Sequence, residues 1–175
     1  MNPQQKQGQS VHIRWMIRRD MPEVLEIENS SFEFPWFEED FIRCLRQRNC
    51  IGMVAEQGDR IVGYMIYELH KSKLHIVNLA VHPAHRRQHV GTQMVAKLVS
   101  KLSSHRRTKI TLEIRETNLP AQLFFRGQGF LAMRVLRGYY EDTGEDAYQM
   151  LYKLPGEHVE EPEEAVNRIA HYEES

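Results

Sequence analysis

The chain has 175 residues, of which 41% are hydrophobic and 9% are aromatic. This composition supplies the core of one domain and excludes an intrinsically disordered protein. Lysine and arginine number 23 against 24 for aspartate and glutamate, so direct nucleic-acid binding through bulk charge is not expected. No apolar run approaches the roughly 18–20 residues that span a bilayer, and the N-terminus lacks a signal-sequence pattern. The sequence therefore predicts a cytoplasmic protein that does not bind a membrane.

Composition divides the chain into three parts. Residues 1–10 are rich in glutamine and nearly devoid of apolar side chains, which predicts a disordered leader. Residues 11–155 carry the apolar periodicity of a folded domain. Residues 156–175 form an acidic tail, in which seven glutamates accompany a single arginine. The tail is expected to form a marginal helix or to stay disordered.

The apolar pattern alternates between strand and helix periods along the folded part. Asp20 is expected to be the N-cap of the first helix, with Pro22 in its first turn. The segment around Gly58 is typical of a hairpin turn between two strands. The expected helices are the one that follows Asp20 and those over residues 37–48, 92–104 and 119–126. The expected strands cover residues 12–16, 50–56, 60–70, 74–81, 108–114, 130–138 and 147–154.

This order, β-α-α-β-β-β-α-β-α-β-β, predicts an α/β fold. Antiparallel neighbours give way to β-α-β units, so the sheet is expected to be mixed, mostly antiparallel and flanked by helices on both faces. Cys44 and Cys50 form no C-x-x-C motif. Their spacing favours ordinary thiols, with a disulfide as the alternative.

A strand-to-helix junction is the most informative motif. The apolar residues 77–81 lead through a basic turn into a helix. The unpaired N–H groups of a helix start, and the positive end of its dipole, favour a phosphate. The residues alone fit an ordinary turn with a solvated basic surface equally well. His82, His85 and His89 have the spacing of metal ligands, but the intervening arginines and Pro83 argue against a metal site.

Four segments together carry a family resemblance. They are Glu28 with Phe32, Pro35, Trp36 and Phe41; residues 77–94; residues 112–130; and residues 138–150, which include Tyr139-Tyr140 and Gly144-Glu145-Asp146-Ala147. Over residues 12–154 the chain resembles the Gcn5-related N-acetyltransferase (GNAT) superfamily. Within it the chain is similar to the RimI-type enzymes, which acetylate protein N-termini such as the alanine of a ribosomal protein. Arg86 and Gly91 fit the superfamily's loop Arg/Gln-x-x-Gly-x-Gly/Ala, whereas His89 replaces the first glycine.

The resemblance implies that acetyl-CoA is the co-substrate. The main chain after Arg86 would cradle the pyrophosphate, and the strand before it would pair with the pantetheine amides. Because His89 carries a Cβ, we expect it to keep an ordinary φ/ψ or to point its ring outward. Asn118 would face the cofactor or only cap a helix. The implied cofactor contacts are Leu79, Ala80, Val81, Arg86, Arg87, Gln88, His89, Val90, Gly91, Thr92, Asn118 and Phe125.

Glu113 is the candidate general base. It interrupts an apolar strand, and acetyl transfer to an amine requires a proton to be removed. Without the resemblance, the same residue fits the solvent-facing side of that strand. Phe125 occupies the position where RimI-type enzymes carry a tyrosine acid. Protonation of the leaving thiolate is therefore expected to fall to water, Tyr139 or Tyr140.

The resemblance also indicates where an acceptor N-terminus would bind. Tyr139 and Tyr140 would form one wall of the binding site, and Glu28, Phe32 and Trp36 the other. Loop or core packing is the alternative role of these aromatic side chains. A separate basic set is a candidate surface for RNA or the ribosome, or merely a solvated face. It comprises Arg43, Arg46, Arg48, Arg106, Arg107 and Lys109.

The sequence thus predicts an acyltransferase, namely an acetyl-CoA-dependent N-acetyltransferase of protein α-amines that acts as a monomer or weak dimer. Two alternatives stay open. One is a GNAT enzyme that acetylates a lysine or a small-molecule amine. The other is a catalytically weakened acyl-CoA-binding or ribosome-binding protein, for which His89 and Phe125 are the reasons.

Overall fold

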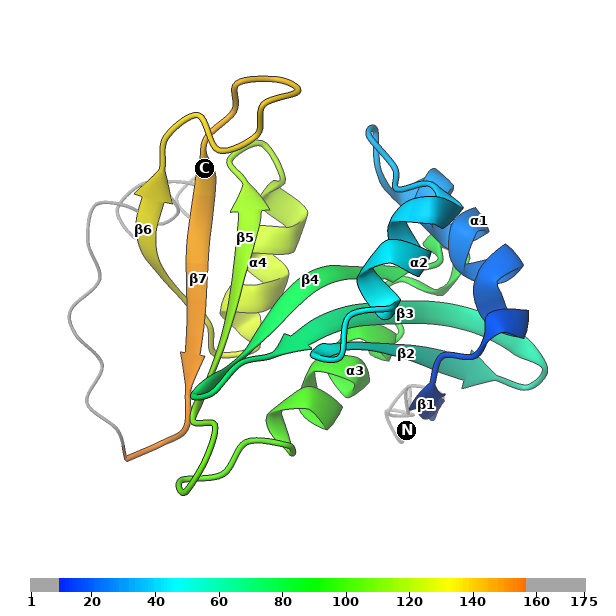
Figure 1. The fold of residues 1–175 in the computed structure, drawn as a ribbon, viewed down its shortest axis with the longest axis horizontal. Coiled ribbons are helices and arrows are strands. Elements are labelled where there is room, and N and C mark those ends of the chain that lie inside the picture. Colours follow the sequence, from blue (N-terminus) through cyan, green and yellow to red (C-terminus); the bar gives the residue numbers. More distant parts are fainter. Residues whose placement is uncertain (1–9, 157–175) are drawn as a thin grey trace, which may run out of the picture. The chain divides into compact units, whose positions relative to one another are not determined.

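The computed structural model describes residues 10–156 (Figure 1). Of these, residues 10–68 and 78–100 form one compact unit, and residues 69–77 and 101–156 form a second. The predicted leader and acidic tail lie outside the described residues, apart from Ser10 and Gly156.

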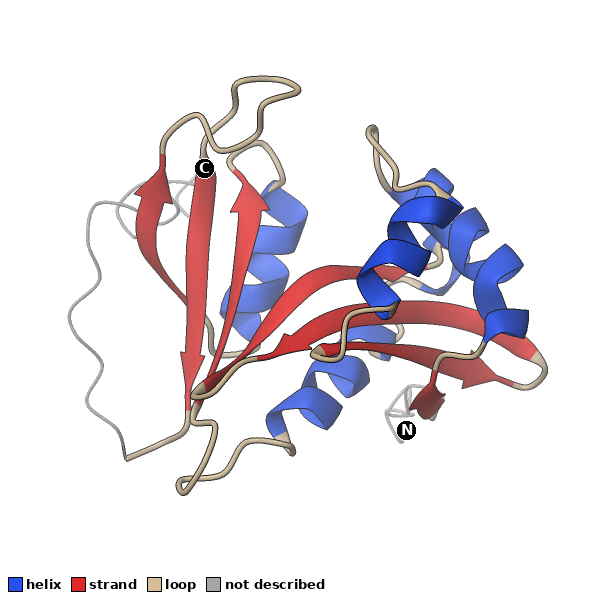
Figure 2. Cartoon of the chain, in the orientation of Figure 1, coloured by secondary structure: helices blue, strands red, loops and turns tan. Residues whose placement is uncertain are grey.

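Within residues 10–156, seven strands and four helices follow one another in the predicted order, and Figure 2 distinguishes them by colour. The hydrogen-bonded order of the strands is β1-β2-β3-β4-β5-β7-β6, and β4 and β5 run parallel. The mixed α/β fold is therefore confirmed. The strands are β1 (His12–Trp15), β2 (Cys50–Gln57), β3 (Arg60–Leu69), β4 (Lys73–Val81), β5 (Lys109–Arg115), β6 (Leu131–Leu136) and β7 (Ala147–Lys153). The helices are α1 (Met21–Ser31), α2 (Glu38–Leu45), α3 (Val90–Val99) and α4 (Leu119–Gly127), with 3-10 turns η1 (Arg18–Asp20) and η2 (Pro83–His85).

Consecutive residues of β3 show how the helices cover the first unit. Tyr64 packs on Phe41 of α2, with ring centroids 5.6 Å apart, and its hydroxyl donates to Glu28 of α1. A Cβ on the preceding Gly63 would lie 3.0 Å from the sulfur of Met94 in α3. Because successive strand residues point to opposite faces, α1 and α2 cover one face and α3 covers the other.

In the second unit, α4 covers one face of β5. Tyr152 of β7 pairs with Ile110 of β5 and packs on Phe130, with ring centroids 5.5 Å apart. Phe130 packs in turn on Phe125 of α4 at 5.2 Å. Paired residues of neighbouring strands share a face, so α4 lies on the side of Ile110. The opposite face of β5 carries Thr111, Glu113 and Arg115.

Asp20 precedes α1 as predicted, but its side chain does not cap the helix. Its carboxylate accepts two hydrogen bonds of 2.8 Å from Arg14 and one of 2.8 Å from the Ile17 N–H. The hydrogen bond from Arg14 holds the pKa of Asp20 below its ordinary value. Asp20 therefore ties β1 to the turn η1.

The second helix ends at Leu45 and not at the predicted residue 48, because the chain turns there. The N–H of Gln47 donates to the Cys44 carbonyl at 3.0 Å, and the N–H of Cys50 donates to the Gln47 carbonyl at 3.1 Å. This turn brings the sulfur atoms of Cys44 and Cys50 to 2.7 Å from each other. Both thiols are free, as predicted.

The third helix lies nearer the N-terminus than the predicted range of residues 92–104. It starts at Val90 and ends at Val99, so Leu102 is outside it. The N–H of Ser103 donates to the Arg107 carbonyl at 2.8 Å, which forms a turn in place of the last helical turn. Serine side chains favour such turns over helix interiors.

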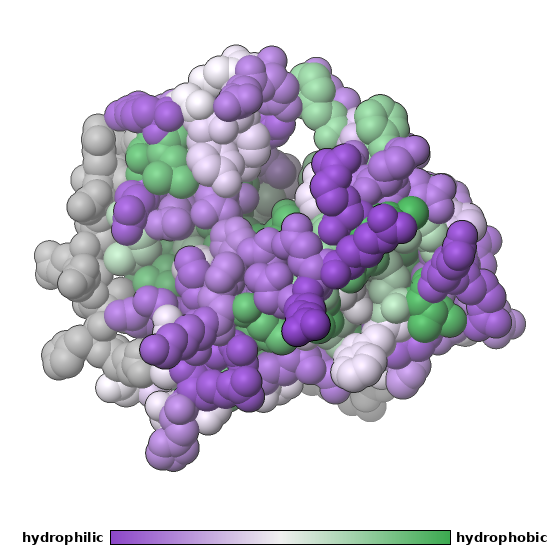
Figure 3. All heavy atoms as spheres, viewed as in Figure 1, coloured by the Kyte–Doolittle hydropathy of each residue, from purple (hydrophilic) through white to green (hydrophobic). Residues whose placement is uncertain are grey.

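Charged and polar side chains cover most of the face shown in Figure 3, with apolar side chains in small areas between them. Single large apolar residues are nevertheless exposed, among them Trp15 and Phe37, both at 70%. Among the described residues, no helix has the length and apolar character needed to cross a membrane.

Candidate active site

The predicted phosphate loop connects β4 to α3 through η2. Arg87 (φ 59°) and His89 (φ 63°) both have a left-handed backbone. Such residues turn neighbouring N–H groups to one side, as in anion-binding nests. Helix α3 begins directly after His89, and N–H groups in the first turn of a helix lack carbonyl partners within that helix. The main chain around Gly91 therefore fits a phosphate.

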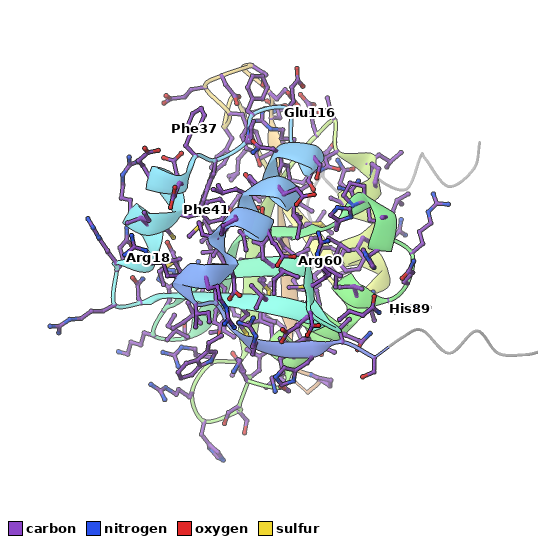
Figure 4. The ribbon with its side chains drawn as sticks, turned by 90° about the vertical axis from the view of Figure 1, so that its right-hand side faces the viewer. Arg18, Phe37, Phe41, Arg60, His89 and Glu116 are labelled. Carbon is purple, nitrogen blue, oxygen red and sulfur yellow. The ribbon has the colours of Figure 1, made fainter. Side chains whose placement is uncertain are left out.

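His89 does not keep an ordinary φ/ψ. It adopts a left-handed conformation that glycine takes without strain, which costs a residue with a Cβ roughly 1–2 kcal/mol. Its ring is exposed and lies at the periphery of the molecule in Figure 4, which agrees with the expected outward orientation of the ring. The His89 ring is therefore accessible to solvent and is not packed in the core of its unit.

Arg86 braces the start of this loop. Its Nε donates to the Val81 carbonyl at 3.0 Å, and its Nη2 donates to the Ser31 hydroxyl at 2.9 Å. The strand before the loop is anchored by the N–H of His82, which donates to the Val62 carbonyl at 2.8 Å. The Arg86 side chain stays exposed, so its charge is accessible to an anion.

Glu113 lies at the centre of the polar face of β5, between side chains of two neighbouring strands. His75 of β4 pairs with Thr111, and Gln149 of β7 pairs with Glu113. Nε2 of His75 is 3.0 Å from Oε2 of Glu113, and Nε2 of Gln149 donates to Oε1 at 3.4 Å. The Glu113 side chain is 14% exposed, so it is neither fully solvated nor sealed in the core.

The surroundings of Glu113 keep it ionised. Burial raises the pKa of its carboxyl, whereas the hydrogen bond and charge of His75, the amide of Gln149 and the charge of Lys73 lower it. The lowering contributions prevail, and the pKa lies below its ordinary value. The carboxylate is therefore unprotonated at neutral pH, which is the state that a general base requires.

Arg115, two residues further along β5, holds the loop that carries the paired tyrosines. Its Nη2 donates to Asp142 at 2.6 Å, and its guanidinium carbon lies 3.9 Å from the centroid of the Tyr140 ring. The rings of Tyr139 and Tyr140 are 5.0 Å apart, edge to face. Burial raises the pKa of Tyr140 to about 12, and burial with the charge of Glu113 raises that of Tyr139.

Glu28 is a buried junction of the first unit, with 1% exposure. Its Oε1 accepts the Trp36 N–H at 2.8 Å, and its Oε2 accepts the Tyr64 hydroxyl and the Asn78 amide, the latter at 3.0 Å. The carboxylate thus joins α1 to β3, β4 and the aromatic turn. In this structure it fixes the turn, while Phe32 and Trp36 are themselves half-buried.

Asn118 and Phe125 lie at the two ends of α4. The side-chain oxygen of Asn118 accepts the Ala121 N–H at 3.2 Å, which confirms the predicted cap. Phe125 is 4% exposed and packs on Phe124, with ring centroids 5.0 Å apart. Phe125 therefore contributes to the core of the second unit.

The predicted site residues fall into both units. The cofactor loop, residues 79–81, Glu28, Phe32 and Trp36 belong to the first, and Glu113, Asn118, Phe125 and the tyrosine pair belong to the second. The basic set is divided too, with Arg43, Arg46 and Arg48 in the first unit and Arg106, Arg107 and Lys109 in the second. Within residues 10–156, no three His, Cys, Asp or Glu side chains are arranged to hold a metal ion.

The family description "Acetyltransferase (GNAT) family" matches residues 21–130. The chain belongs to this family. An N-alpha-acetyltransferase of Sulfurisphaera tokodaii is 28% identical over 164 residues, covering 85% of this chain and 96% of that protein. The ribosomal protein bS18-alanine N-acetyltransferase of Escherichia coli K12 is 27% identical over 136 residues, covering 78% and 91%. The crystal structure of the E. coli ribosomal-protein-S18-alanine N-acetyltransferase has the same fold, with a TM-score of 0.73, 24% identity and coverage of 87% and 100%.

The side chains that hold Glu113 and the tyrosine loop of this GNAT acetyltransferase were not expected from its sequence. His75, Gln149 and Arg115 contact the candidate base or the loop, yet each resembles an ordinary strand residue. Only the pairing of β4, β5 and β7 brings these side chains together. A sequence signal does exist for Arg115, because it continues the alternation of Thr111 and Glu113.

Proposed function

We propose that this GNAT enzyme transfers the acetyl group of acetyl-CoA to the α-amine of a protein N-terminus. The observation that carries the proposal is the partly buried, ionised carboxylate of Glu113, held at both oxygens. The names of the relatives from S. tokodaii and E. coli describe N-alpha and alanine N-acetylation and support the same reaction.

The first unit would bind acetyl-CoA. The left-handed residues of the loop and the start of α3 support a pyrophosphate site at residues 86–92. Arg86 would add its charge from the exposed side of the loop. Main-chain groups of residues 79–81 would pair with the pantetheine amides.

Glu113 would act as the general base. The amine nitrogen forms a bond to the thioester carbonyl carbon, the carbon–sulfur bond breaks, and Glu113 takes the proton that the nitrogen loses, directly or through water. An α-amine with a pKa of ~8 is partly neutral at pH 7, unlike a lysine side chain with a pKa of ~10.4. A single carboxylate is therefore a sufficient base for an N-terminal substrate.

The sulfur would leave as a thiolate that takes its proton from solvent. Phe125 has no proton to donate. The hydroxyl of Tyr140, with a pKa of about 12, holds its proton more tightly than a thiol with a pKa of ~8.5. We therefore assign Tyr139 and Tyr140 to binding the acceptor peptide. Glu28 would act indirectly, by fixing the aromatic turn.

Two matched peptides test the choice of acceptor. One has a free α-amine and no lysine, and the other has a blocked N-terminus and one internal lysine. Acetylation of the first alone is the expected result with acetyl-CoA. Acetylation of the second or of small amines would replace the proposal with a lysine or small-molecule acetyltransferase. Binding of acetyl-CoA by calorimetry, without transfer to any amine, would favour an acyl-CoA-binding protein.

The natural acceptor is proposed to be a ribosomal protein, reached in the cytoplasm by a monomer or weak dimer. The name of the E. coli relative supports this choice of acceptor. Comparison of protein N-termini by mass spectrometry, in cells with and without the enzyme, tests it directly. A different acceptor would be assigned if the N-termini of ribosomal proteins keep their acetylation while other protein N-termini lose it.

A further inference from the structure

Among the described residues, His75 alone has hydrogen-bond or ion-pair contacts with both polar neighbours on β5, Thr111 and Glu113. Its Nδ1 is 2.8 Å from the Thr111 hydroxyl oxygen, and its Nε2 is 3.0 Å from Oε2 of Glu113. The His75 side chain is 19% exposed, so its ring is held mostly within the protein. These two contacts fix both the position and the rotation of the ring.

The contacts also define which ring nitrogen carries hydrogen toward Glu113. An ionised carboxylate only accepts hydrogen bonds, so Nε2 of His75 must be the donor. Nδ1 can then accept from the Thr111 hydroxyl in the neutral ring, or donate to its oxygen in the charged ring. In both states Thr111 supports the ring from the side away from Glu113.

We propose that His75 is the positioning residue of the general base: its Nε2–H fixes Oε2 of Glu113 and leaves Oε1 to receive the proton of the amine. This inference rests on the proposed role of Glu113. A glutamate side chain has three rotatable bonds, and Gln149 alone contacts the other oxygen at 3.4 Å, a long hydrogen bond. His75 therefore supplies the shorter contact that orients the carboxylate.

The groups around Glu113 determine what the loss of His75 does to its titration. Lys73 lies on the same strand as His75, Gln149 is on β7, and Tyr139 and Tyr140 interact with Glu113 from the loop before β7. Burial raises the pKa of Glu113, and among these groups only Lys73 lowers it through a charge. Without His75, the pKa of Glu113 should rise, and the acid limb of kcat should move to higher pH.

The test uses the full-length enzyme with acetyl-CoA and the free α-amine peptide. His75→Phe removes the donor while keeping a ring, and His75→Gln restores an N–H at a similar reach. Thr111→Val leaves His75 in place but removes its support. His70→Phe is the matched control, because the His70 ring lies 6.3 Å from that of His75 on the same hairpin. Glu113→Gln reports on the base itself.

His75→Phe is expected to lower kcat by about 10- to 100-fold, because small misplacements of a reacting group have effects of this size. The peptide KM and the acetyl-CoA affinity should stay unchanged, and the acid limb should shift upward. His75→Gln should recover most of kcat, Thr111→Val should lower it by a few-fold at most, and His70→Phe should match the wild type. Bound acetyl-CoA, measured by calorimetry, identifies variants that remain folded.

Three results would overturn the inference. The first is a His75→Phe variant that keeps the wild-type kcat and acid limb while Glu113→Gln is inactive. This result would remove the role of His75 and leave that of Glu113 intact. Equal loss in His75→Phe and His75→Gln would assign His75 to ring packing. Full activity of Glu113→Gln would refute Glu113 as the base, and with it a positioning role for His75. Transfer to the lysine peptide instead would change the acceptor without touching either residue's role.

Discussion

The cofactor loop of residues 86–92 and the polar row of β5 present different parts of the chain to their proposed ligands. The loop offers main-chain N–H groups, directed by two left-handed residues and a helix start. The row offers the side chains of Thr111, Glu113 and Arg115, each held by named partners on other elements. One region depends on backbone conformation and the other on side-chain chemistry and strand register.

This difference predicts that the two regions tolerate substitution differently. His89 takes a left-handed conformation that is typical of glycine, and its ring is exposed. A replacement of Glu113 should have no such freedom, because the proposed proton transfer requires a carboxylate oxygen. The imperfect loop motif is therefore compatible with cofactor binding, whereas the β5 row is where small chemical changes should matter most.

The largest contrast is expected between Glu113→Gln and Gln88→Ala. Glu113→Gln should lower kcat by about 10²- to 10⁴-fold, the usual contribution of a general base. Gln88→Ala removes an exposed side chain that donates to the Ala84 carbonyl at 3.3 Å, and it should leave acetyl-CoA affinity unchanged. Steady-state kinetics and calorimetry measure the two effects. A large loss of affinity in Gln88→Ala would show that the loop also binds through its side chains.

Near neutral pH, kcat/KM is expected to follow the ionisation of the acceptor amine, whereas Glu113 determines the acid limb of kcat at lower pH. The pKa of Glu113 is lowered from the ordinary value of 4.5, so it is charged at every pH above that value. Below pH ~8, kcat/KM should rise about tenfold per pH unit as the α-amine loses its proton. Loss of the Glu113 charge should appear only as the pH falls through its lower pKa. An additional ionisation of the free enzyme near pH 6 would identify a different base.

Arg115→Met should raise the KM for the acceptor peptide by roughly tenfold, since it removes a charge-assisted hydrogen bond and a ring contact that hold the tyrosine loop. Acetyl-CoA affinity should not change. Arg137→Met is the matched control, because Arg137 is 63% exposed and bonds to Asp146 near the same loop. Exposed ion pairs contribute little, so this variant should behave as the wild type. Equal effects of both variants would show that net charge, and not the loop, determines peptide binding.

The sequence predicts most features that depend on residues close together in the chain. Alternation places Glu113 on the polar side of a strand, and the composition around Asn118 predicts a helix cap, which its bond to Ala121 confirms. The order of strands and helices follows from the same local patterns. Each of these features is determined by residues that are close together in the sequence.

What the sequence could not predict depends on distant residues or on backbone conformation. His75 meets Glu113 only because β4 and β5 run parallel with His75 opposite Thr111. Asp20 fits an N-cap, yet the hydrogen bonds from Arg14 draw its carboxylate away from the helix. The left-handed backbone of His89 could not be predicted either, since a histidine in a sequence does not indicate a positive φ.

The smallest expected effect tests the main-chain character of the loop most directly. His89→Gly should stabilise the protein by about 1 kcal/mol in urea unfolding, because glycine adopts φ 63° without the Cβ penalty. Gly58→Ala is the matched control, since Gly58 has φ 60° and open space around its missing Cβ. It should lose a similar amount, about 1 kcal/mol.

Acetyl-CoA affinity of His89→Gly separates backbone from side chain, because the substitution keeps the conformation and removes the ring. Unchanged affinity is expected if main-chain N–H groups bind the pyrophosphate. A weaker affinity, with the stability gained as expected, would show that the His89 ring itself contacts the cofactor. The loop would then bind partly through a side chain, as β5 does, and the contrast between the two regions would not hold.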